Sequence, residues 1–267
     1  MALKSSGQRH FREKCLSESS IAFDRYPSTF WTFSWACNLA YITFHSIFIV
    51  WGLFPLLAPG LFPFTNDIFF GFLPHWINIL AQHWAGVVGL AGVELVSLVA
   101  TVGLYRGAWM VMEGQQPRFA DLIRWDGAAI KRLFLAWSAY QLVLAPPLGL
   151  ATLVGHGLRS MGIGPMIWWP IGLLAWAWLL WFGHNQFLFS LLCLFQKAKP
   201  FIAMRSSMQI VKKEKLSSLI DYSNRPISNA LLGFRNFFNP WDYFYRLAAY
   251  RQVFGADDRL GLIKPQS

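Results

Sequence analysis

Long apolar runs with almost no charge are the feature that most restricts how this chain can fold. They cover residues 30–57, 77–105, 133–154 and 167–195. Runs of about 18 or more apolar residues match the hydrocarbon thickness of a bilayer. Only 13% of the residues are charged, whereas soluble domains carry about 25%. The sequence therefore predicts an all-α, polytopic membrane protein with about four transmembrane helices.

The distribution of Lys and Arg predicts the orientation of these spans. With four crossings, Arg159 is the only one of the 23 Lys and Arg residues that does not fall on the same side. Basic residues concentrate on the cytoplasmic side of membrane proteins, so both termini are expected in the cytoplasm, and a bacterial inner or thylakoid membrane is expected. The net charge of +10 is then interpreted as retention charge and contact with anionic lipid, not as a nucleic-acid surface.

Three segments follow from this topology. Residues 1–29 form a cytoplasmic N-terminal segment, residues 30–195 a four-helix transmembrane domain, and residues 196–267 a cytoplasmic tail. The loop at 58–76 is rich in Pro and aromatic residues and is expected in the interface or re-entering the membrane. Pro146-Pro147 interrupt the third span, where a kink is tolerated if neighbouring groups satisfy the freed carbonyls.

The tail begins with a basic amphipathic pattern over residues 200–220. Its apolar residues at helical spacing are Phe201, Met204, Met208 and Val211, and its clustered lysines are Lys212, Lys213 and Lys215. Such a pattern is typical of a helix lying on the membrane surface. The three lysines are therefore expected to contact lipid headgroups.

A second, aromatic helix is predicted further along the tail. Asn239 is its expected cap, with Pro240 in the first turn, and Gly255 is its expected end. Its apolar content is too wide for a helix surrounded by water. Four aromatic residues are therefore predicted to dock on other membrane protein subunits: Trp241, Phe244, Tyr245 and Tyr250.

Glu94 is the carboxylate nearest the middle of any predicted span. An ionisable group at that depth costs about 2.5–3.5 kcal/mol and has to face protein or water. Helical spacing places it in a polar stripe with His83, Ser97 and Thr101. Three interpretations stay open: a protonated, hydrogen-bonded packing residue, part of a proton or solute path, or a ligand.

Histidine and cysteine spacing predicts no metal site. No H-x-x-x-H or H-E-x-x-H pattern occurs, and the three cysteines form no C-x-x-C pair. His45 and His184 lie singly in spans, where haem or chlorophyll could use them as axial ligands, although the sequence requires no cofactor. Motifs of nucleophilic catalysis and nucleotide binding are also absent from the sequence.

Two short segments carry a resemblance to a known group. Leu104-Tyr105-Arg106-Gly107, followed by Met112 to Ile123 with Gly114, Pro117 and Asp121, resembles a loop of bacterial multi-helix membrane proteins. The membrane domains attached to some glycerophosphodiester phosphodiesterases are similar. Residues 200–213 resemble the amphipathic connector of that group, whose members usually continue into further spans. The resemblance implies a helical membrane fold and no particular activity.

The sequence as a whole favours a non-enzymatic membrane subunit, scaffold or assembly factor that docks on a larger complex. A small transporter or channel that uses the Glu94 stripe is the first alternative. A pigment-associated subunit of a photosynthetic or redox complex is the second.

Overall fold

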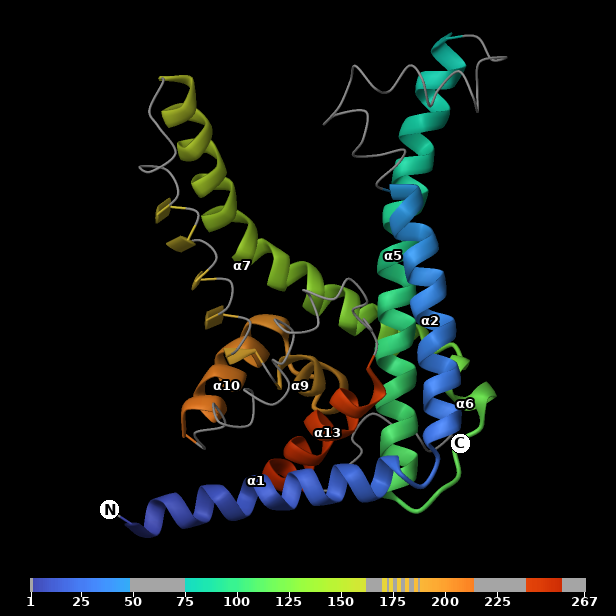
Figure 1. Cartoon of the computed structure of the whole chain (residues 1–267), viewed down its shortest axis with the longest axis vertical. Coiled ribbons are helices and arrows are strands. Elements are labelled where there is room, and N and C mark those ends of the chain that lie inside the picture. The colour runs from blue at the N-terminus through green and yellow to red at the C-terminus, as the bar shows by residue number, and fades with distance from the viewer. Residues whose placement is uncertain are drawn as a thin grey trace. The chain divides into compact units, whose positions relative to one another are not determined.

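The computed structural model describes residues 2–48, 75–161, 188–213 and 239–255, together with residues 170–171, 173–174, 177–178, 181–182 and 185–186. The secondary structure of these ranges is helical, which confirms the all-α prediction. The helices are α1 (Ala2–Phe23), α2 (Pro27–Ile47), α5 (His75–Met112), α6 (Phe119–Ile123), α7 (Gly127–Ser160), α9 (Phe189–Phe195), α10 (Pro200–Lys213) and α13 (Pro240–Phe254) (Figure 1).

One helical segment in the described part of the chain is long and apolar enough, by length and composition, to cross a membrane. It is Trp84–Met112, within α5. The segment lies over the second predicted span and continues beyond it, because α5 ends at Met112 and not at Tyr105. The predicted loop at 106–132 therefore begins as helix and contains α6 as well as the start of α7.

The helices divide into two compact units. The first to be described, the α2/α5 unit, contains Tyr26–Trp125 and Asn236–Pro240. The second, the α7 unit, contains Met1–Arg25, Asp126–Arg235 and Trp241–Ser267. These units group residues by contact, so they do not coincide with the three segments expected from topology.

Glycines on one side of α5 hold the α2/α5 unit together. A Cβ atom at Gly89 would lie 2.5 Å from the backbone nitrogen of Phe48, and one at Gly92 would overlap the ring of Phe44. Nearer the end of α5, Cβ atoms at Gly103 and Gly107 would overlap Leu122 of α6. Small residues let helix backbones approach closely, as in membrane helix pairs. Both α2 and α6 thus pack on the glycine side of α5.

Helix α7 is longer than the third predicted span and is continuous. It runs from Gly127 to Ser160, includes Pro146 and Pro147, and extends past residue 154, where the third predicted span ends. The ribbon of α7 bends along its length (Figure 1), which agrees with the loss of two backbone N–H donors at the prolines. The Asp126 carboxylate accepts a hydrogen bond from the Ala129 N–H at 2.9 Å and so fixes the beginning of α7.

Residues of the fourth predicted span do not form one uninterrupted helix. Leu188 is the N-cap of α9, and Gln186 and Leu188 lie in turns. Ser207 of α10 bridges this break: its hydroxyl donates to the Asn185 carbonyl at 2.9 Å and accepts from the Leu188 N–H at 3.3 Å. A single buried hydroxyl therefore joins α10 to the backbone groups that the break leaves without helical partners.

Candidate functional site

Three residues of the predicted polar stripe lie on α5: Glu94, Ser97 and Thr101. Glu94 is half-buried and lies about half a turn around the helix from Gly89 and Gly92, which face α2. Ser97 and Thr101 are also half-buried, and the Ser97 hydroxyl donates to the Val93 carbonyl at 2.8 Å. Because α2 packs on the opposite side, a partner for the Glu94 carboxyl has to come from outside α2. His83 belongs to α5, but its side chain lies outside the described residues.

The candidate ligand residues differ in how much the structure says of them. The ring of His45 stacks on Tyr41 one turn earlier in α2, with centroids 5.6 Å apart and planes at 16°. His184 lies outside the described residues. Across the described ranges, no group of three or more His, Cys, Asp or Glu side chains could hold a metal ion.

All three cysteines are free, and Cys15 is the most enclosed of them. It has no exposed surface on the side of α1 that also buries Ser19 and Ala22. Burial raises the pKa of the Cys15 thiol to about 12, and the charge of Glu18 adds to the rise. The thiol is therefore a neutral packing group.

The aromatic tail helix forms where it was expected, but its rings are inside the molecule. α13 begins at Pro240 and ends at Phe254, and Gly255 adopts a φ of +80°. Phe244 and Tyr245 are completely buried and Tyr250 is 2% exposed. These three side chains are covered by protein in this structure, and their role in docking stays a prediction.

The chain itself supplies the cover for these rings. Phe244 meets Phe23 of α1 edge-on at 5.6 Å, and Tyr250 packs on Phe195 of α9 at 5.5 Å. Trp241 is half-buried and stacks on Tyr245 at 5.2 Å with planes at 10°. Trp241 is thus the one of the four predicted docking residues that keeps substantial exposed surface.

Helix α10 is amphipathic as predicted, but its apolar side is turned toward protein. Met204 and Val211 are buried together with Ala203 and Ser207, and α10 packs on α7 and α9. Phe201 is 62% exposed and its neighbour Ile202 is also exposed. Of the predicted apolar stripe, Phe201 therefore stays available to a lipid surface, whereas Met204 and Val211 do not.

The lysines predicted to contact headgroups are described only in part. The Lys212 ammonium lies 6.0 Å from the ring centroid of Trp181, at the limit of a cation–π contact. The side chain of Lys213 and the whole of Lys215 lie outside the described residues. Lys212 is thus held beside an exposed Trp, a residue type that is enriched at membrane interfaces.

Sequence reasoning missed the structural role of Arg106. Its side chain is 1% exposed, and its guanidinium donates to the carbonyls of Asp121 at 3.0 Å and Arg124 at 2.8 Å. These carbonyls lie at the end of α6, where a cation also meets the negative end of the helix dipole. An Arg just after an apolar run is normally interpreted as a retention charge. The signal that could have identified it is the following Gly107, which brings α6 against α5.

Because Arg106 fixes α6, three apolar side chains are presented on a defined surface. Phe119, Ile123 and Trp125 are exposed, whereas Leu122 between them is buried. Phe119 is anchored edge-on against Phe33 of α2 at 5.8 Å. At the beginning of α6, the Arg118 N–H donates to the Asp121 carboxylate at 2.9 Å. We refer to Phe119, Ile123 and Trp125 as the α6 surface.

Comparison of the chain with protein-family models, with curated proteins and with solved structures finds no match in any of the three.

Proposed function

We propose that this chain is a polytopic membrane protein with four spans and cytoplasmic termini, which acts as a non-enzymatic subunit, scaffold or assembly factor of a larger membrane complex. The segment of α5 that is long and apolar enough to cross a membrane supports the second span. Exposed apolar residues at helical spacing support the first: Trp35, Leu39 and Ile42 form a stripe along α2. Water would make such a stripe unfavourable, whereas lipid or another membrane helix would cover it.

The observation that carries the subunit role is the α6 surface. Three large apolar side chains remain exposed on α6 and just after its end, and the position of α6 is fixed by the buried Arg106. A rigid surface loses little conformational entropy when a partner binds. Aromatic residues, and Trp above all, are enriched among the residues that contribute most to binding. We therefore assign docking to the α6 surface.

Co-purification tests this role. The tagged protein is extracted in mild detergent, and the proteins that accompany it are identified by mass spectrometry. Replacing Ile123 and Trp125 by Ala should remove a specific partner, because each such hot-spot truncation costs about 2 kcal/mol, roughly thirtyfold in affinity. The matched control is Val88→Ala, an exposed residue of the same unit outside both the α6 surface and the α2 stripe. An absorption spectrum of the same sample tests the pigment alternative.

Labelling of single cysteines from outside the cell tests the topology. Positions near Asn66 and Arg159 should react with an impermeant reagent, and positions near Arg118 and Lys212 should not. Reaction at Arg118 from outside would contradict the four-span arrangement.

A transporter remains the second candidate, and the position of Glu94 favours it. The carboxyl is half-buried on a side of α5 that does not face α2, where a path along α5 would need it. If the stripe carries protons, Glu94→Gln should abolish pH-dependent uptake in proteoliposomes while expression and helicity stay normal. Unchanged uptake would remove the transporter from consideration and leave Glu94 as a packing residue.

A further inference from the structure

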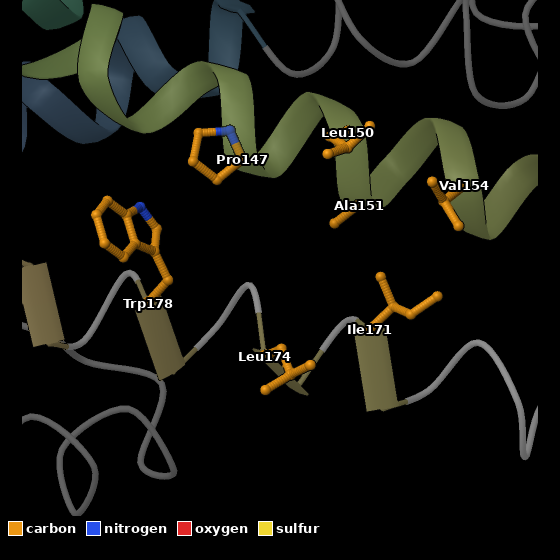
Figure 2. A pocket seen from close by; sticks show the side chains of 7 residues that line it. All are labelled: Pro147, Leu150, Ala151, Val154, Ile171, Leu174 and Trp178. Atoms are coloured by element: carbon orange, nitrogen blue, oxygen red, sulfur yellow. The ribbon is translucent and has the colours of Figure 1, made fainter.

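An apolar groove lies between α7 and residues 171–178, within the α7 unit. It has a volume of about 510 Å³, and its lining consists of Pro147, Leu150, Ala151, Val154, Ile171, Leu174 and Trp178. Side chains from the two walls point toward each other across it, with the indole of Trp178 at the end near Pro147 (Figure 2). The volume falls within the range of about 300–1,000 Å³ that is typical of binding sites for small molecules.

The chemistry of the walls excludes water and charged groups as occupants. A buried water needs two to four polar partners, and none of the lining side chains carries a charge or a hydroxyl group. The one polar atom among these side chains, the Trp178 indole nitrogen, is buried and has no hydrogen-bond partner among the described residues. Only a hydrocarbon occupant would match this lining.

The groove is long enough for only part of one hydrocarbon chain. From Pro147 to Val154, α7 rises about 10 Å, which is a third of the roughly 30 Å hydrocarbon core. Leu150 and Leu174, at 64% and 72% exposure, stand on opposite walls and leave the groove open to its surroundings. An occupant can therefore enter from the side while the rest of its molecule stays outside.

We propose that this groove binds one acyl chain of a phospholipid from the outer leaflet. The assignment of the leaflet rests on the proposed function, because in the four-span arrangement residues 147–154 and 171–178 lie in the outer half of the bilayer. The lipid chain fills the space between α7 and the opposite wall. The lining side chains then make dispersion contacts with the lipid that an empty groove would not provide.

Photocrosslinking in reconstituted vesicles tests this site. The full chain is placed in phosphatidylcholine vesicles that contain phosphatidylcholine with a diazirine on its acyl chain, and labelled peptides are identified by mass spectrometry. Labelling should be concentrated on residues 147–154 and 171–178. Ala151→Phe fills the groove and should lower labelling of residues 171–178 by about fivefold, equivalent to about 1 kcal/mol.

The matched control is Leu153→Phe on the same helix. Leu153 is 73% exposed and does not line the groove, so this change should leave the labelling of residues 171–178 as it was. Ile171→Phe fills the groove from the other wall and repeats the test if the first variant does not fold. Equal labelling in the filled and control variants would overturn the proposal. So would labelling of exposed Leu142 that equals labelling of the groove, since ordinary lipid contact gives that pattern.

The same samples separate failure of this site from failure of the proposed function. Extraction of the protein from membranes by alkaline carbonate would contradict the membrane function itself. Retention in the membrane with even labelling would contradict only the acyl-chain site.

Discussion

The two units differ in how their helical segments pack together. In the α2/α5 unit, glycines bring the backbone of α5 against α2 and α6, and an added Cβ atom would overlap its neighbours. In the α7 unit, α7 and residues 171–178 are separated by a groove of about 510 Å³, and the packing relies on aromatic rings near α9 and α13. Close backbone contact leaves no space for a ligand, whereas ring packing with a groove does. Ligand binding is therefore expected in the α7 unit and structural rigidity in the other.

The largest effect is expected from removing a buried ring in the α7 unit. Phe244→Ala should lower the free energy of unfolding by about 3–5 kcal/mol, because it leaves a cavity beside Phe23. Thermal unfolding in detergent, followed by circular dichroism, measures the change. Trp241→Ala, at a half-buried position of the same helix, should have a smaller effect. If both variants unfold at the wild-type temperature, the ring packing of this unit is not what stabilises it.

Removing the buried cation of the α2/α5 unit should have the next largest effect. Arg106→Met keeps the length of the side chain but removes both hydrogen bonds to the end of α6, which should cost about 2–3 kcal/mol. Hydrogen exchange should accelerate in residues 119–124, while the α7 unit keeps its protection. Lys131→Met, which removes an exposed cation outside α6, is the control. Unchanged exchange in α6 would show that the helix is held by its apolar contacts alone.

The smallest effect tests the glycine packing directly. Gly103→Ala introduces a Cβ atom that overlaps the Leu122 carbonyl and should destabilise the α2/α5 unit by about 1–3 kcal/mol. Gly157→Ala on α7 meets nothing within 4 Å and should be neutral or slightly stabilising. The melting temperatures of the two variants measure this difference. Equal changes in melting temperature would contradict the contrast between the two units.

Helix positions could be predicted from the sequence, because the signals that begin and end a helix are local. Asn239-Pro240 and Gly255 marked α13 to within a residue, and the apolar runs located α5 and most of α7. The ends of the runs were less informative. α5 continues past Arg106, because the Arg106 guanidinium donates hydrogen bonds to backbone carbonyls within the fold. Local composition does not reveal these partners.

The partners of each apolar surface could not be predicted, for a physical reason. Lipid tails, the interior of a protein and a bound subunit are all apolar, so one amphipathic pattern fits each of them. Met204 and Val211 of α10 were expected against lipid but are covered by protein. Phe244 and Tyr250 were expected against a partner but are covered by α1 and α9. Only the long-range contacts distinguish these cases, and a single sequence does not contain them.

The order of the two units along the chain sets the order in which a ribosome can complete them. Apart from Asn236–Pro240, the α2/α5 unit is one continuous stretch, and all of its helices have been synthesised by Trp125. The α7 unit starts earlier, with α1, but the ring contact of Phe23 cannot form until Phe244 has been synthesised. Chains fold as they emerge, at about 5–20 residues per second. The nascent protein therefore passes through a stage in which α2 and α5 are already paired. At that stage α1 still exposes the surface that α13 will cover. A chaperone or an assembly partner could bind this surface of α1.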